Sequence, residues 1–305
     1  MKKILSISLG SSSRDHTTTY QFLGQECQLS RQGTDGDLDK AVQMFRDLDG
    51  QVDAFGFGGG EFFLQVGKRR YYFRDFKPIR NAIQISKIAD GNGVKSLLEK
   101  RAFAALEKYL NEKEAKTLRG LPALQTTAVD RYGMAEAMVE AGLDVTFGDF
   151  MFSLGLSIPV KSLSLVRLLA TIILPAVIQL PFVWFYPLGS RQDLPPRPRW
   201  EKYYQQARVI AGDFLQIRCN MPDNLSGKII VTNTTTAKNV AELKKRNLHI
   251  LVTVTPRLGG RSFGTNVMEA TLLALMDKPQ SEVTQADFVD LIERIPLMPN
   301  IEVLN

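Results

Sequence analysis

The sequence has few of the residues on which disulfide frameworks and structural metal sites depend. Among its 305 residues are two cysteines, Cys27 and Cys219, and two histidines, His16 and His249. The cysteines are far apart and neither belongs to a spaced ligand pair, which argues against a disulfide framework and a structural zinc site. We therefore predict no metal.

A strong excess of one sign of charge is also lacking. The 38 Lys and Arg residues exceed the 32 Asp and Glu residues by a net charge of +6, and the excess is diffuse. The short basic clusters at 68–70 and 244–246 are flanked by acids, and no basic stripe interleaved with aromatics is present. We predict no nucleic-acid partner and a small-molecule ligand, with at most a modest preference for anions.

A secretory signal peptide is not recognisable, because the apolar run after Met1 ends at serines within ten residues. We therefore predict a cytoplasmic protein. Residues 168–188 complicate this, since they form a 21-residue stretch without a charge, which is long enough for a membrane span. Pro175 and Pro181 interrupt it, and strands of one predicted sheet lie on both sides. We favour a kinked helix that is buried or covers an interface, and leave open contact with a membrane surface or a second copy of the chain.

The composition is that of a globular protein, with 44% hydrophobic and 23% charged residues. Strand patterns alternate with helical patterns, which predicts an α/β fold with parallel sheets. We expect an α/β substrate domain over 1–116 that ends in a connector helix. A Rossmann-like, doubly wound domain follows over 117–305, with an apolar insert at 156–190.

The predicted elements follow from apolar periodicity and turn residues. Strands are expected at 3–9, 20–29, 52–57, 88–89, 123–129, 208–213, 228–234 and 249–256, with a hairpin over 62–73. Helices are expected at 37–48, 77–85, 94–115, 133–142, 237–246 and 264–276.

Residues 123–149 have the pattern of one strand–turn–helix–strand unit, in which the second strand ends at Asp149. The turn directs free N–H groups of a helix N-terminus at its ligand, which favours a phosphate, and Asp149 is placed for a ribose hydroxyl. The turn holds one glycine, Gly133, where the dinucleotide fingerprint has three, so a plain structural unit stays an alternative. The candidate cofactor-binding residues are Asp130, Arg131, Tyr132, Gly133, Met134, Asp149, Thr234, Thr255 and Gly264, and Asp130, Asp149, Asp213, Thr234 and Thr255 are expected to ring one crevice.

Three further stretches can carry chemistry. Residues 10–16 form a serine-rich turn after the first strand, where hydroxyls suit a carboxylate or polyol. Asp90 follows a strand and faces a predicted interdomain cleft, although it could simply cap the next helix. Residues 255–266 combine glycines and two arginines before a helix, as an anion site or a solvated loop would.

Together these stretches resemble the shikimate and quinate dehydrogenase family, including bacterial quinate 5-dehydrogenase-like proteins. The family has the same domain order. Its Asn-Thr-Asp-Gly-x-Gly segment is similar to residues 89–94, and its serine-rich turn to residues 11–16, although the turn here lacks the proline. The family's Val-Thr-x-Pro-x-Lys segment has no clean counterpart, so Lys68 or Lys77 would replace its lysine, and the apolar insert is absent from the family.

The resemblance implies an oxidoreductase that transfers a hydride between a nicotinamide cofactor and a hydroxylated carboxylic acid. Asp90 with Lys68 or Lys77 would be catalytic, and Asp149 would favour NAD over NADP. The substrate-binding residues would be Ser11, Ser13, Asn92 and Asn266. The alternative is a Rossmann-like nucleotide- or metabolite-binding protein without redox activity, which the missing glycines and lysine segment favour.

Overall fold

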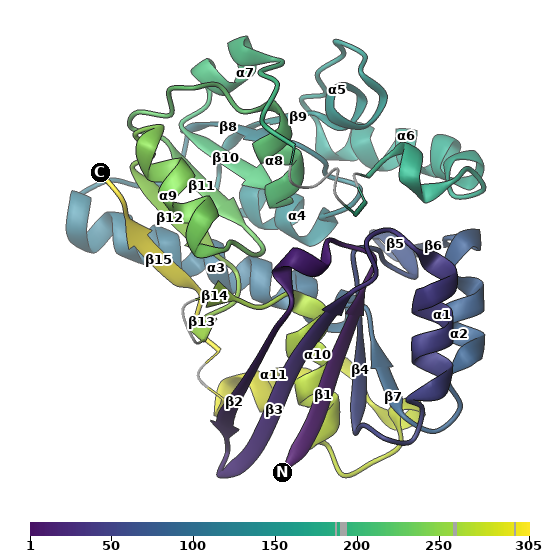
Figure 1. Ribbon diagram of the computed structural model, residues 1–305. Coiled ribbons are helices and arrows are strands. Elements are labelled where there is room, and N and C mark those ends of the chain that lie inside the picture. The colour runs from purple at the N-terminus through teal and green to yellow at the C-terminus, as the bar shows by residue number, and fades with distance from the viewer. Residues whose placement is uncertain (187, 190–193, 259–260, 296) are drawn as a thin grey trace.

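The chain folds into two α/β lobes, each built on a mostly parallel sheet (Figure 1). The computed structural model describes residues 1–186, 188–189, 194–258, 261–295 and 297–305. Parallel neighbours pair throughout both sheets except for one antiparallel edge strand in each. The predicted α/β fold with parallel sheets is confirmed.

The first sheet has the strand order β2-β3-β1-β4-β7. Its strands are β1 (Lys2–Ser8), β2 (His16–Phe22), β3 (Gln25–Gly33), β4 (Ala54–Gly58) and β7 (Lys87–Ala89). The single strand predicted at 20–29 is wrong. Leu23 and Gly24, with φ of 51° and 78°, make a tight turn that divides it into the antiparallel pair β2–β3.

Side chains of β1 alternate between two cores. Leu5 and Ile7 pack with α1 (Leu38–Asp47) and α2 (Lys77–Ala82), beside the hairpin of β5 (Phe63–Val66) and β6 (Arg69–Tyr72). Ile4 faces the other way, towards α10 (Thr265–Leu275), which comes from the far end of the chain. Every residue of α10 from 266 to 274 is buried. This helix therefore covers the face of the first sheet towards which Ile4 points.

The second sheet has the strand order β15-β12-β11-β10-β8-β9. Its strands are β8 (Pro122–Gln125), β9 (Asp144–Phe147), β10 (Val209–Gly212), β11 (Ile229–Thr232), β12 (Ile250–Thr253) and the antiparallel β15 (Asn300–Val303). Helices α3 (Asn92–Glu114) and α4 (Tyr132–Glu140) cover one face. On the other face lie α7 (Glu201–Gln206), α8 (Phe214–Asn220) and α9 (Ala237–Lys245).

The chain passes between the lobes at several points. It leaves the first sheet from β7 into α3, returns from β12 through the hairpin β13 (Arg257–Leu258) and β14 (Arg261–Ser262) to α10, and goes back from α11 (Gln285–Arg294) to β15 (Figure 1). The first lobe is therefore assembled from two separate segments.

The apolar stretch forms most of α6 (Leu163–Val177), after the short helix α5 (Asp149–Leu154). One side of α6 is buried through Val166, Ala170 and Leu174, while Leu168 and Ile172 on the other side are 56% and 67% exposed. Among the described residues, no helix combines the length and apolar character needed to cross a membrane. Contact of this segment with a membrane surface or a second copy stays a prediction.

Candidate functional site

A cavity of about 280 Å³ lies between the two lobes, at the carboxyl ends of the strands of both sheets. From the first lobe it is lined by Ser6 and Ser8 of β1, the glycines after β4, and Asp90 after β7. From the second lobe it is lined by residues that follow β8, β9, β10 and β11: Thr127, Asp149, Asp213 and Asn233. Carboxyl ends of parallel strands are where α/β sheets bind ligands, so this is the candidate site.

One wall of the cavity is apolar. The inner side of α6 supplies Val166, Leu169, Ala170, Ile173 and Leu174, and seven phenylalanines also line the cavity: Phe57, Phe73, Phe150, Phe182, Phe185, Phe214 and Phe263. The segment 168–188, which looked like a candidate span, thus provides part of the lining. A wall of this kind favours a ligand with an apolar body.

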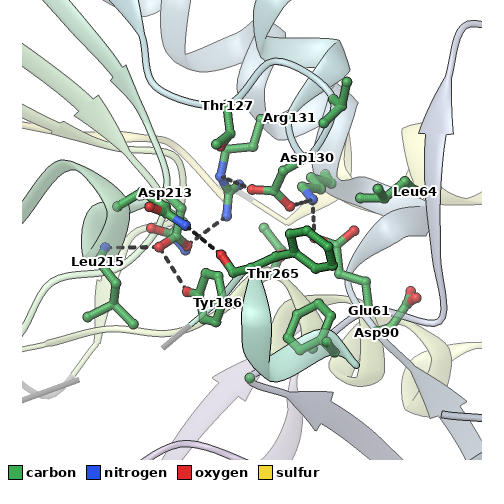
Figure 2. A pocket seen from close by; sticks show the side chains of 18 of the residues that line it. Glu61, Leu64, Asp90, Thr127, Asp130, Arg131, Tyr186, Asp213, Leu215 and Thr265 are labelled. Atoms are coloured by element: carbon green, nitrogen blue, oxygen red, sulfur yellow. Dashed lines mark hydrogen bonds and ion pairs between the residues drawn. The ribbon is translucent and has the colours of Figure 1, made fainter. Parts of the chain in front are cut away.

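The cavity is also lined by a buried network of charges, part of which is drawn in Figure 2. Lys95 Nζ lies 2.5 Å from Glu61 Oε1 and 3.3 Å from Asp130 Oδ1. Arg131 is 3.0 Å from Glu99 and 3.3 Å from Asp213. Arg131 Nε also lies 3.6 Å from Asp130 Oδ2. Lys95 is therefore shared between two carboxylates and Arg131 between three.

Asp213 is held by neutral groups as well. Its carboxylate accepts hydrogen bonds from the Tyr186 hydroxyl at 2.8 Å and from the Asn233 amide at 2.7 Å. It also accepts one from the backbone N–H of Leu215 at 2.9 Å, which caps α8. This carboxylate has a full set of partners within the protein.

The electrostatics divide the acids into two kinds. Burial raises the pKa of Glu61 well above its ordinary value, with the neighbouring Asp130 adding to the effect against Lys95. Burial also opposes ionisation of Asp130, but Lys95 and Arg131 outweigh it and hold the pKa of Asp130 well below its ordinary value. Burial raises the pKa of Asp149 to about 6, although backbone N–H groups such as that of Val129 at 2.9 Å oppose the shift.

Four polar atoms of residues that line the cavity have no hydrogen-bond partner within the described residues: Glu61 Oε2, Asp149 Oδ2, Thr127 Oγ1 and Arg131 Nε. Arg131 Nε lies 3.6 Å from Asp130 Oδ2, as an ion pair. Thr127 is 4% exposed. A buried polar atom without a partner costs about 1–3 kcal/mol, so these atoms are candidates for ligand contacts. In the described ranges no group of three or more His, Cys, Asp or Glu side chains could hold a metal ion.

The structure brings several of the predicted site residues to the cavity: Asp90, Asp130, Arg131, Asp149, Thr234, Gly264 and Asn266. Asp90 has structural partners, because it accepts hydrogen bonds from the backbone N–H of Phe62 at 2.8 Å and of Asn92 at 3.0 Å. Asn266 of α10 donates to the Ser6 hydroxyl of β1 at 2.8 Å, within the first lobe.

The turn before α4 does not fit a pyrophosphate. A Cβ at Gly133 would collide with Ser96, so this glycine permits close packing of α4 on α3. Tyr132 and Met134 are core residues. The Arg131 side chain is occupied by buried carboxylates, and Asp130 places a negative charge where the phosphate would lie.

Other predicted residues do not line the cavity. Lys68 is in the turn between β5 and β6, and Lys77 begins α2; both are exposed. Ser11 and Ser13 hydrogen-bond to each other at 2.7 Å, and the Asn92 amide donates to the Phe63 carbonyl. The buried Thr255 hydroxyl donates to the Phe263 carbonyl at 2.7 Å. Within the proposed anion loop at 255–266, residues 259 and 260 lie outside the described residues.

Sequence reasoning missed Lys95, Glu99 and Glu61. Lys95 and Glu99 are four residues apart in a helix whose neighbouring buried positions are apolar, such as Leu98 and Ala102. Charged residues within an apolar helical stripe were a usable signal, because such positions are tolerated only when the charges are paired.

Two family models match the chain. The model described as a domain of unknown function (DUF8754) matches residues 93–304, and a second domain of unknown function (DUF8753) matches residues 3–90. The chain belongs to the DUF8754 family. No curated protein matches its sequence.

Among solved structures, the chain is similar to a galactofuranose binding protein, with 11% identity, a TM-score of 0.38, and 99% and 95% of the two chains covered. A transporter solute-binding protein from Burkholderia graminis in complex with D-arabinose gives 9% identity and a TM-score of 0.39 over 99% and 95%. An arabinose-transporter periplasmic binding protein from Shewanella gives 9% and 0.37 over 96% and 95%. We carry over no ligand or mechanism at these scores.

These findings correct the expected family. The resemblance to shikimate and quinate dehydrogenases is wrong, because the family models that match the chain are two domains of unknown function. The oxidoreductase function and the catalytic roles of Asp90, Lys68 and Lys77 are withdrawn with it. Asp90 anchors a loop, and the two lysines lie away from the cavity.

Proposed function

We propose that the protein binds a small amphipathic metabolite in the cavity between its lobes. The observation that carries the proposal is the cavity itself, whose wall combines buried polar groups at the strand ends of both sheets with the apolar side of α6. Its volume of about 280 Å³ is near the lower end of the ~300–1,000 Å³ that small-molecule sites span. That size suits a small metabolite better than a complete dinucleotide.

This function corresponds to the non-redox alternative, a metabolite-binding protein. NAD binding stays an untested prediction, and the turn before α4 lends it no support. Sugars are one class to test, since the similar solved structures bind them, but the seven phenylalanines and the α6 side chains offer a sugar few hydrogen bonds.

The experiment blocks the cavity with a larger side chain on one of its lining residues. Ala170 lines it and is 4% exposed, whereas Ile172, two residues along the same helix, is 67% exposed. We compare Ala170→Phe with Ile172→Phe as a matched control. Native mass spectrometry of freshly purified protein, and calorimetry with a metabolite panel that includes sugars, measure binding.

We expect the parent chain and Ile172→Phe to bind a small molecule and Ala170→Phe to lose it while keeping its circular dichroism spectrum. Equal binding by both variants would place the ligand elsewhere. A complete absence of binding to the parent chain would refute the function.

A further inference from the structure

We propose that the ligand carries a protonated amine, which is held at the acidic wall of the cavity, defined as Thr127, Glu61, Asp130, Asp149 and Asp213, with its apolar body against α6. The inference rests on the proposed function and adds the ligand's chemical class.

The first argument is the balance of charge at the acidic wall. Lys95 is shared by Glu61 and Asp130, and Arg131 by Glu99 and Asp213. Asp149 adds a further carboxylate, whose contacts are to backbone N–H groups such as that of Val129. Burial raises the pKa of Glu61 and of Glu99, so these two acids are left out of the balance. Asp130, Asp149 and Asp213 still outnumber Lys95 and Arg131 among the described residues here, and a buried excess of negative charge favours a cationic ligand.

The second argument is the unsatisfied atoms. Thr127 Oγ1, Glu61 Oε2 and Asp149 Oδ2 line the cavity without partners among the described residues, and all three oxygens can accept hydrogen bonds. The fourth such atom, the donor Arg131 Nε, already faces the Asp130 carboxylate at 3.6 Å. Thr127 is 96% buried, since its exposed fraction is 4%. An ammonium group has three N–H donors and no acceptor, so its hydrogen-bonding capacity is complementary to this set.

Anionic ligands are disfavoured at the same wall. A carboxylate or phosphate placed beside Asp130 and Asp149 would meet like charge in a partly dehydrated site. Arg14 and Arg31 line the first-lobe side of the cavity, away from the residues of the acidic wall, and Arg31 is paired with Asp15 at 2.8 Å. The preference at the acidic wall is thus opposite to the +6 net charge of the whole chain.

The third argument is the apolar wall, which determines the character of the rest of the ligand. Phe57, Phe182 and Phe214 and the inner side of α6 receive a compact aliphatic or aromatic body. A small amine with one such body fulfils both halves of the site.

Calorimetry at pH 7 tests the inference with probes of similar shape: 2-phenylethylamine, 2-phenylethanol and phenylacetate, with D-arabinose as a polar neutral compound. We expect the amine to bind at least tenfold more tightly than the alcohol, and phenylacetate not to bind. At pH 6, where Asp149 is half protonated, we expect amine binding to release up to about half a proton, seen as a dependence of the heat on buffer ionisation enthalpy.

Two variants test whether the preference for the amine comes from the acidic wall. Asp149→Asn and Glu61→Gln should each weaken amine binding at least tenfold and leave alcohol binding unchanged. Asp144→Asn, at a side chain that is 65% exposed outside the cavity, is the control. Should Glu61→Gln fail to fold, Asp149→Asn decides alone.

If the alcohol or D-arabinose binds as tightly as the amine, the ammonium inference is overturned while the metabolite-binding function stands. If no probe binds and native mass spectrometry finds no small molecule either, both proposals are refuted.

Discussion

Replacing Thr127 with valine removes a buried hydroxyl that has no partner in the described part of the protein. Valine has nearly the same shape, so the cavity wall and the backbone are kept. Thr232 is the matched control, because it is 0% exposed and its hydroxyl donates to the Gly212 carbonyl at 2.8 Å. The two substitutions are chemically identical and differ in whether a hydrogen bond is lost.

The magnitudes follow from that difference. Thr232→Val loses an internal hydrogen bond and leaves a buried carbonyl less satisfied, which costs about 1–2 kcal/mol. Thr127→Val loses no internal bond and replaces an unpaired hydroxyl with a methyl, so we expect the free energy of unfolding to stay equal or rise by up to ~1 kcal/mol. The two variants should differ by about 2 kcal/mol.

Urea denaturation of ligand-free protein, followed by circular dichroism, measures both values. The same Thr127→Val protein should bind the cavity ligand more weakly. A Thr127→Val variant as destabilised as Thr232→Val would show that the hydroxyl has a partner in the folded chain, and would refute the argument from unsatisfied atoms.

Three further outcomes are expected. Arg131→Met leaves the buried Glu99 and Asp213 without their cation and should cost about 3–5 kcal/mol of unfolding free energy; a urea-denaturation loss below 1 kcal/mol would contradict this pairing. Asp149 has a folded pKa raised to about 6, so its stabilising contribution is complete below about pH 4 and is lost as the pH rises through 6. Asp149→Asn should therefore be more stable than the parent by about 3 kcal/mol at pH 7 and equal to it at pH 4, and a thermal-melt difference that is the same at both pH values would exclude the shift. The protein should sediment with phosphatidylglycerol vesicles through the exposed side of α6, and less of it should do so after Ile172→Ser. A dimer in ultracentrifugation without vesicle binding would assign that surface to a second copy. If neither vesicle binding nor a dimer is observed, the prediction is wrong.

The strands, helices and their alternation were predictable from the sequence because they depend on local apolar periodicity. Asp130, Asp149 and Thr234 were expected around one crevice, and all three line the cavity, since residues that follow parallel strands lie at one edge of a sheet. The return of α10 to the first sheet was not predicted, because no local pattern reports which sheet a helix covers.

The dehydrogenase resemblance failed for a physical reason at Gly91 and Gly93. Gly91 has φ of 100° at the start of α3, and a Cβ there would meet the Thr265 hydroxyl at 2.5 Å. A Cβ at Gly93 would meet Glu269 of the same helix, α10. The close packing of α3 against α10 explains these glycines. The Asp-Gly-x-Gly pattern at residues 90–93 therefore has a structural cause and does not indicate dehydrogenase chemistry.

The return of α10 also bears on how the molecule can be dissected. A fragment that stops at residue 116 lacks the helix whose residues 266–274 are all buried, and it would expose the apolar face around Ile4, Ala54 and Ala89 to water. The N-terminal third should therefore aggregate when produced alone and become soluble when the remaining two thirds are supplied as a separate polypeptide. Reconstitution from two pieces, rather than truncation, is the way to obtain this lobe for study.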